Sequence, residues 1–430
     1  MKIFETEKDS YNDILAAVAP KNAGSAEDIA NLVASIIDDV KTRGDEALLE
    51  LGKKFDSPNL DNIVVTDYEF EAAYRNIDDN LLNAIRTAKE NIKIFHEKQM
   101  QKSWIDFQED KAYGQIIRPI EKVGFYAPGG LAPYPSTVLM AAVPAKVAGV
   151  KTVAMTSPVQ KDGKISAPML VAAKECGVDY VYKAGGAQAI AALAFGTDSV
   201  VKVDKIVGPG NAFVTEAKRQ LFGIVGIDQL AGPSEILVIA DNTAEPAYVA
   251  ADMLSQAEHG DDSRCVLVTN SRELANSVLI EIDKQTATAE RNSFIKASLN
   301  EYGIVIIARN IEECCEISNE FAPEHLELAV DNPWETLKLI KNAGTIMMGH
   351  FTPVPACDFA AGPNHTLPTN GTAKFSSALS VDDFLKKSGL LALSKKSLEK
   401  LAPTVLELAE AEGFHAHANT VRIRLSLDKE

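Results

Sequence analysis

The stretch KTVAMTSPVQKDGKISAPMLVAAKECGVDYVYKAGG, residues 151–186, decides the fold of this chain. Its two ends, residues 151–157 and 178–186, are short runs rich in Val, Thr and Tyr, which is typical of strands. Between them, residues 166–177 form an Ala-rich run with helical spacing. A strand, a helix and a second strand in succession build a parallel sheet, so the stretch predicts an α/β fold.

The same alternation extends in both directions along the chain. Helical runs occupy residues 136–149 and 211–223, and a strand-like run lies at 204–210. A second series of strand-like runs follows at 234–241, 264–270, 303–310, 325–330 and 344–349. We therefore predict two α/β domains, at residues 124–235 and 236–375.

The two ends of the chain have a different texture. Residues 1–123 are charged and largely helical in pattern, and we expect them to pack on the second α/β domain. Residues 376–430 form a smaller helical tail, which ends in VRIRLSL at 421–427 and alternates there as an edge strand would. A short tail that carries histidines is a candidate for docking onto another domain or another subunit.

The composition is that of an ordinary soluble globular protein, with 430 residues of which 46% are hydrophobic and 24% charged. A net charge of −17 argues against a nucleic-acid or anionic-membrane surface. No apolar run approaches the ~20 residues of a membrane helix, and the acidic N-terminus is unlike an export signal. The five cysteines show no C-x-x-C spacing, which indicates reduced thiols in the cytoplasm.

An ionisable pair stands at the start of one predicted strand. Glu324 and His325 follow Pro323, which marks a junction, and precede the alternating run of 325–330. A positioned histidine or carboxylate is what general acid–base catalysis requires. The segment alone leaves a solvated turn open as the alternative.

Three glycine-rich loops each follow a predicted strand and precede a predicted helix. They lie within residues 126–139, 183–196 and 206–218. Glycines there let the backbone approach a ligand at the carboxyl ends of parallel strands. Ordinary turn chemistry is the alternative for any single loop, because none has a dinucleotide or P-loop fingerprint.

Histidines and carboxylates gather at three further places. Gln256 and His259 share one face of the last turn of a predicted helix, where the histidine could bind zinc or complement the helix dipole. The loop 350–371 and the segment 412–418 are rich in both residue types: they contain His350, Asp358, His365, Glu412, His415 and His417. Surface turns are the alternative, but together the clusters favour a metal enzyme with nitrogen and oxygen ligands.

Eight ordered blocks resemble histidinol dehydrogenases along nearly the whole chain. They include GGAQAIAALAFGT at 185–197, DMLSQAEHG at 252–260, FAPEHLEL at 321–328 and EGFHAHA at 412–418. The resemblance implies two Rossmann-like open-sheet domains in an aldehyde-dehydrogenase-like arrangement, with N-terminal helices and a small C-terminal helical tail. It also implies oxidation of L-histidinol to L-histidine through histidinal, in two NAD-dependent steps that end histidine biosynthesis.

The resemblance carries residue roles with it. It implies His325 as the general base and Glu324 as the residue that activates water. It implies one zinc ion per subunit, with the ligands Gln256, His259, Asp358 and His417. The NAD positions are Tyr126, Gln188 and Asn211. Substrate contacts fall at the zinc ligands, at the catalytic pair and at Ser234, His365 and Glu412.

Family members are homodimers whose C-terminal tail crosses to the partner's site, which would place Glu412 and His417 on the other subunit. The chain departs from the family pattern at Cys357–Asp358–Phe359, where Gly-Asp-Tyr is usual. A cysteine beside a zinc ligand raises a thiol nucleophile as an alternative for the aldehyde step. The rival functions are a related zinc and NAD dehydrogenase acting on another amino alcohol or a diol, and a non-catalytic metal- or dinucleotide-binding protein.

Overall fold

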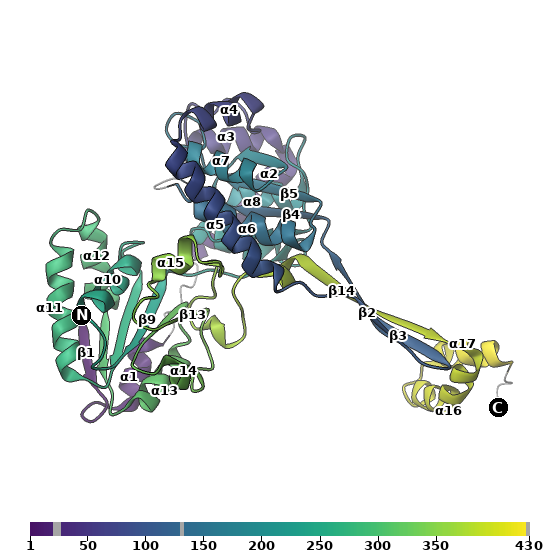
Figure 1. Cartoon of the computed structure of the whole chain (residues 1–430). Coiled ribbons are helices and arrows are strands. Elements are labelled where there is room, and N and C mark those ends of the chain that lie inside the picture. The colour runs from purple at the N-terminus through teal and green to yellow at the C-terminus, as the bar shows by residue number, and fades with distance from the viewer. Residues whose placement is uncertain (20–26, 130–132, 427–430) are drawn as a thin grey trace. The chain divides into compact units, whose positions relative to one another are not determined.

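The structure is a computed structural model that describes residues 1–19, 27–129 and 133–426. The chain divides into two compact units. The first unit comprises Met1–Gln99 and Ile120–Phe384, and the second comprises Met100–Pro119 and Leu385–Glu430. Both units are drawn in Figure 1, and each is described by itself.

The first unit contains a five-stranded parallel sheet with the order β6-β5-β4-β7-β8. Its strands are β4 (Lys122–Tyr126), β5 (Thr152–Ser157), β6 (Tyr180–Lys183), β7 (Lys205–Val207) and β8 (Gly226–Ile227). The intervening helices are α6 (Pro135–Ala148), α7 (Ala167–Glu175), α8 (Gly186–Phe195) and α9 (Ala212–Leu221). The strands predicted at 151–157, 178–186 and 204–210 are confirmed.

Four N-terminal helices pack on the helices of this first sheet. They are α2 (Glu27–Arg43), α3 (Asp45–Phe55), α4 (Asp67–Arg75) and α5 (Asp79–Glu97). Val33, Ile36 and Val40 of α2 share one apolar core with the alanines of α8, which is why α8 is buried on every side. The prediction that the first 123 residues pack on the second α/β domain therefore fails for α2–α5.

The second sheet has six parallel strands in the order β1-β11-β10-β9-β12-β13. They are β1 (Lys2–Glu5), β9 (Glu235–Ala240), β10 (Arg264–Thr269), β11 (Ile304–Ile307), β12 (His325–Ala329) and β13 (Thr345–Met348). The helices around it are α1 (Tyr11–Val18), α10 (Pro246–Ala257), α11 (Arg272–Thr286), α12 (Asn292–Tyr302), α13 (Ile311–Phe321), α14 (Pro333–Leu337) and α15 (Val354–Phe359). Separate apolar cores lie on its two faces, so the central strands are buried throughout. The α/β prediction with two parallel open sheets is confirmed.

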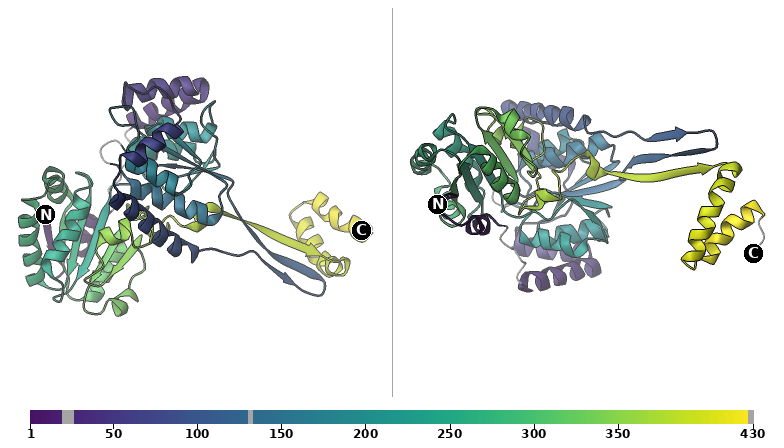
Figure 2. Two further views of the ribbon diagram at one scale, coloured as in Figure 1. Left: turned by 45° about the horizontal axis from the view of Figure 1, so that its top comes forward. Right: turned by 90° about the horizontal axis from the view of Figure 1, so that it is seen from below.

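The second unit is built from antiparallel strands and a helix pair (Figure 2). The strands β2 (Trp104–Phe107), β3 (Lys111–Pro119) and β14 (Leu385–Leu393) pair in the order β14-β3-β2. The helices are α16 (Lys395–Ala411) and α17 (His415–Leu425). The edge strand predicted at 421–427 is wrong, because residues through Leu425 are helical and bury Ala418 and Val421 at helical spacing. Within the described ranges, no helix is both long and apolar enough to cross a membrane.

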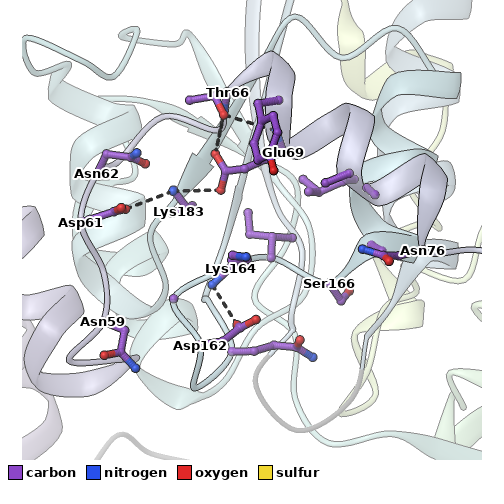
Figure 3. Close-up of a pocket in the computed structure, with 18 residues that line it drawn as sticks. Asn59, Asp61, Asn62, Thr66, Glu69, Asn76, Asp162, Lys164, Ser166 and Lys183 are labelled. Carbon is purple, nitrogen blue, oxygen red and sulfur yellow. Dashed lines mark hydrogen bonds and ion pairs between the residues drawn. The ribbon is translucent and has the colours of Figure 1, made fainter.

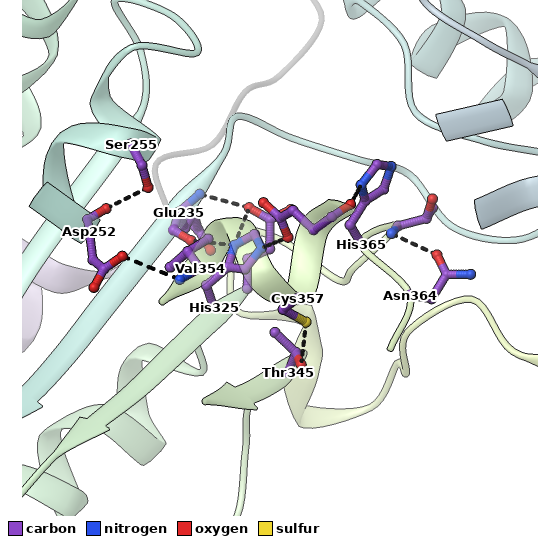
Figure 4. Close-up of polar contacts among 12 residues, drawn as sticks. Glu235, Asp252, Ser255, His325, Thr345, Val354, Cys357, Asn364 and His365 are labelled. Atoms are coloured by element: carbon purple, nitrogen blue, oxygen red, sulfur yellow. Dashed lines mark hydrogen bonds and ion pairs between the residues drawn. The ribbon is translucent and has the colours of Figure 1, made fainter. Parts of the chain in front are cut away.

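A buried carboxyl pair joins three elements of the second sheet. Glu327 of β12 is 2% exposed and hydrogen bonds to Asp252 of α10, which is also buried. Asp252 Oδ1 accepts a hydrogen bond from the N–H of Val354 at 3.2 Å, at the start of α15 (Figure 4). Burial, reinforced by the neighbouring Asp252, raises the pKa of Glu327 to about 9. The two carboxyl groups therefore share one proton near neutral pH.

We expect Glu327→Gln to raise the free energy of unfolding at pH 8 by at least ~1 kcal/mol. The pKa of Glu327 is raised on folding, so unfolding releases a proton between about pH 4.5 and 9, and the wild type loses stability as pH rises through that window. Glutamine donates a comparable hydrogen bond and has no proton to release. Urea unfolding of both proteins from pH 6 to 9 measures the difference.

Glu313→Gln is the matched control. Glu313 is another buried carboxyl group beside the same sheet, but its pKa is lowered on folding, whereas that of Glu327 is raised. Hydrogen bonds from Arg309 and Thr6 outweigh its burial and lower its pKa to about 2. This control should lower the free energy of unfolding at pH 8. A wild-type free energy of unfolding that does not fall between pH 6 and 9 would contradict the assignment to Glu327.

Candidate active site

A pocket of about 300 Å³ in the first unit gathers most of the residues predicted as site residues. Those lining it are Ser234, Gln256, His259, Glu324, His325, Asp358 and His365. Glu412 and His417 belong to the second unit and are not among its lining residues. The structure thus brings together seven predicted residues whose sequence positions extend from Ser234 to His365.

The pocket lies where two kinds of strand end meet. Ser234 precedes β9 and His325 begins β12, so the second sheet contributes the amino ends of its strands. Pro128, Pro209 and Gly210 line the same pocket and follow strands of the first sheet, which contributes carboxyl ends. Two of the predicted glycine loops therefore line the same pocket as Ser234 and His325.

The local chain geometry places the ionisable pair at the pocket. Helix α13 ends at Phe321, and Ala322 adopts a left-handed conformation with φ 53°. That conformation reverses the chain, and strand β12 starts three residues later at His325. The junction predicted at Pro323 has this structure. Glu324 is 8% exposed and His325 is 3% exposed, so the solvated-turn alternative does not describe them.

The backbone of one residue, Glu235, holds both members of the pair. The N–H of Glu235 donates to Glu324 Oε2 at 2.8 Å, and the carbonyl oxygen of Glu235 lies 3.0 Å from His325 Nδ1. Because a carbonyl only accepts, Nδ1 carries the hydrogen, and Nε2 is the ring atom that faces Asp358 Oδ1 at 3.0 Å. Figure 4 shows these contacts around His325.

The charges around His325 set its protonation. Burial alone would lower the pKa of this imidazole, but the Glu324 charge and the hydrogen bond to Asp358 outweigh burial and raise it well above its ordinary value. The neighbouring His365 behaves in the opposite way, because burial lowers its pKa. His365 Nδ1 hydrogen bonds to the carbonyl of Asp358 at 2.8 Å, and its Nε2 lies 3.2 Å from Thr137 Oγ1.

Three of the predicted zinc ligands share the pocket. Gln256, His259 and Asp358 offer an amide oxygen, an imidazole and a carboxylate, which are donor types that zinc accepts. Gln256 is 1% exposed, and its Oε1 atom has no hydrogen-bond partner among the residues that the structure describes. A buried oxygen without a partner fits a metal ligand. Residues 1–19, 27–129 and 133–426 contain no cluster of three His, Cys, Asp or Glu side chains that would hold a metal unaided.

A second pocket, of about 450 Å³, collects the predicted NAD residues Tyr126, Gln188 and Asn211. It shares Pro128 and Tyr134 with the first pocket, so the two adjoin. The hydroxyl of Tyr126 accepts a hydrogen bond from the N–H of Gly186 at 3.3 Å, and burial raises its pKa to about 12.

One predicted residue of this second pocket has a structural role, and one lining residue was not predicted. Asn211 caps helix α9 through its side-chain oxygen, which occupies that atom with Phe213 and Val214. Asp56 also lines the pocket; burial raises its pKa to about 6, and it accepts a hydrogen bond from the N–H of Gly185. Asp56 follows a long helical run, so the sequence offered no loop signal that would have identified it.

A third pocket, of about 410 Å³, contains none of the predicted site residues (Figure 3). Its buried cation, Lys183 Nζ, is 3.1 Å from Glu69 and 3.6 Å from Asp61. Glu69 also closes the capping box of α4 with Thr66. These polar groups are thus already paired with one another.

Known proteins of one family are similar to this chain over nearly its whole length. The family model for histidinol dehydrogenase matches residues 19–425. Curated histidinol dehydrogenases are similar over most of the chain: 51% identical in Clostridium acetobutylicum, covering 92% of each chain, and 48% in Bacillus subtilis, covering 94% of each. The crystal structure of histidinol dehydrogenase from Elizabethkingia anophelis superposes with a TM-score of 0.94 at 40% identity, covering 99% of this chain and 98% of that one.

The chain belongs to the histidinol dehydrogenase family. It is therefore an oxidoreductase that acts in histidine biosynthesis.

Cys357 departs from the usual family pattern but does not reach the pocket. Its thiol is 5% exposed, lies 3.6 Å from Thr345 Oγ1 and is not among the residues that line the cavity (Figure 4). Burial raises the pKa of this thiol, so it is not a ready thiolate nucleophile.

We expect Cys357→Ala to retain histidinol dehydrogenase turnover within about twofold, because a buried thiol of raised pKa cannot attack the aldehyde. Steady-state kcat with histidinol measures this. Cys265→Ala is the control for loss of a buried thiol, since Cys265 lies in the core of the second sheet. A hundredfold loss in Cys357→Ala, with aldehyde accumulating, would restore the thiol mechanism.

Glu235 and Arg264 were also not predicted. Glu235 is buried against Glu324 and His325, and Arg264 is buried against Glu235, but each stands at the start of an apolar strand-like run. The only available signal was the unusual placement of a charge at those positions.

Proposed function

We propose that this chain oxidises L-histidinol to L-histidine in two successive NAD-dependent steps, with His325 as the general base and Glu324 as the residue that activates water. The observation that carries the proposal is the backbone of Glu235, whose N–H and carbonyl hold the two groups at the wall of a pocket adjoining a second, cofactor-sized pocket. The cytoplasm suits five cysteines that are all free and buried.

The first oxidation needs a group that removes the hydroxyl proton while hydride leaves carbon for NAD⁺. The Nδ1–H of His325 is held by the Glu235 carbonyl, so Nε2 is the atom that takes this proton. Because the pKa of His325 is raised, Nε2 is free to act as a base only at a pH above that raised value. The product is enzyme-held histidinal, and His325 carries the proton until it is released.

The second oxidation begins with water. Glu324 accepts a proton from water as the hydroxide oxygen adds to the aldehyde carbon, which gives the singly deprotonated gem-diol. The second hydride then leaves for a second NAD⁺ while His325 takes the remaining hydroxyl proton, and the carboxylate of histidine remains. The fixed hydrogen bond from the Glu235 N–H leaves the other oxygen of Glu324 available for this step.

Zinc fits this site through Gln256, His259 and Asp358 from the first unit, with His417 as the fourth ligand, one ion per subunit. When bound, zinc would supply a Lewis-acidic centre that templates the substrate. Ser234 and His365 line the same pocket and are proposed as substrate contacts, together with Glu412.

A homodimer with exchanged tails is the proposed source of Glu412 and His417. The second unit exposes large apolar side chains on both its strands and its helices: Phe107 is 77%, Leu391 67%, Leu408 58% and Ile423 68% exposed. Apolar surface of this extent is typical of an interface. A second copy of the chain would cover it.

The central experiment counts NADH formed per histidinol consumed by the purified protein, with and without a zinc chelator. We expect two NADH per histidine produced, with activity lost on chelation and restored by zinc. Glu324→Gln should stop at one NADH and accumulate aldehyde, because water is no longer activated. NADH from another amino alcohol or a diol but none from histidinol would overturn the substrate assignment.

A mixed dimer tests the tail exchange. We expect His325→Ala and His417→Ala homodimers each to be inactive, whereas a mixture of the two chains regains up to about a quarter of wild-type activity. Exchange places both substitutions in one site of the mixed dimer and leaves the other site intact. His415→Ala is the control for the tail, because His415 pairs with Glu410 on the same unit. An inactive mixture with proven heterodimers would contradict the exchange.

A further inference from the structure

The backbone of Glu235 holds the catalytic pair, and its side chain is fixed in turn by a buried cation. Arg264 Nη1 donates to Glu235 Oε1 at 3.0 Å, and the two side chains are 5% and 1% exposed. Glu235 Oε2 accepts from the N–H of Asn370 at 3.1 Å. Both carboxylate oxygens are thus occupied, which leaves the residue no freedom to rotate.

Arg264 has further partners that fix its own position. Its Nη2 donates to the carbonyls of Val18 at 2.8 Å and Ala19 at 3.1 Å, at the end of helix α1. Its guanidinium lies 4.7 Å from the ring centre of Phe321, four residues before His325. Its backbone N–H donates to the carbonyl of Ser234 at 2.9 Å. A planar five-donor group is suited to holding several elements at once, and lysine could not make this set.

We propose that Arg264 and Glu235 form a positioning pair that sets the orientation of Glu324 and His325. Arg264 and Glu235 touch neither pocket, so they act only through the peptide groups on either side of the Glu235 side chain. The N–H sets the Glu324 carboxylate and the carbonyl sets the His325 ring. One anchored residue therefore serves both oxidations, which explains why a charge pair is buried at the start of two adjacent strands.

The alternative is that the pair only satisfies two buried charges. Single and double variants distinguish the positioning role from this purely structural one. Replacing both members of a buried ion pair by apolar groups is often neutral for stability, whereas replacing one member leaves the other charge buried and unpaired. We expect Arg264→Met to lower both the melting temperature and kcat. In the double variant Arg264→Met/Glu235→Met the melting temperature should return towards the wild-type value. Its kcat should stay about 10- to 100-fold low, since misplaced catalytic groups cost that much.

The control is Lys183→Met/Glu69→Met, an ion pair beside the first sheet in which the lysine is buried and the glutamate partly so. It should change the melting temperature without a comparable loss of kcat. The KM for NAD should remain within about twofold in the Arg264 variants. Recovery of kcat in step with melting temperature in the double variant would overturn the positioning role. Arg264→Lys, which keeps the charge but not the fork, is expected to fold with kcat still reduced, and wild-type kcat there would also overturn it.

The inference rests on the proposed function wherever kcat is the readout, so a second measurement is independent of activity. The measurement is an NMR spectrum of protein labelled with ¹⁵N-histidine. Because the Glu235 carbonyl accepts a hydrogen bond from the Nδ1–H of His325, this proton should exchange slowly with water and give a visible signal. Loss of the signal in His325→Gln assigns it to His325. We expect the signal to be lost in the folded double variant. An unchanged signal there would overturn the proposal even if histidinol proved not to be the substrate.

Discussion

The active site depends on the parallel pairing of strands β9 and β12. In this register His325 lies opposite Ile236, which sets the peptide groups of Glu235 against Glu324 and His325. Two hydrogen bonds from one residue then fix a carboxylate and an imidazole whose relative position would otherwise depend on two free side chains. Sheet pairing thus fixes, through the backbone, the two groups to which the proposed mechanism assigns proton transfer.

The two sheets of the first unit contribute different chemistry. The first sheet presents the carboxyl ends of its strands, where glycine loops allow close backbone approach and helix N-termini follow. The second sheet presents the amino ends of β9 and β12, where Ser234, Glu324 and His325 gather. Both pockets include Tyr134 in their walls. A hydride donor in one pocket and an acceptor in the other would therefore be neighbours.

Much of this was predictable because strong periodicity and turn chemistry act locally. The strands from β4 to β13 carry β-branched runs, and Glu324 and His325 stand at the start of one of them. His259 follows helix α10 and Asp358 lies in helix α15, so their place beside His325 came from the family resemblance and not from strand periodicity. The packing of α2–α5 was not predictable, since an amphipathic helix shows that it has a partner but not which sheet supplies it. Residues 421–427 alternate over only seven positions, too short a run to separate strand from helix.

Glu235 shows a further limit of reading side chains. Its contribution comes from its N–H and carbonyl, groups that every residue except proline possesses, so no residue-type motif can reveal it. What the sequence does contain is the compensating anomaly: a carboxylate and a guanidinium at the starts of adjacent buried strands, in register with each other. Burying charge is costly unless it is paired and hydrogen bonded. Under the proposed positioning role, the pair is kept at this place, where apolar residues would fill the space, for the geometry that it imposes on Glu324 and His325.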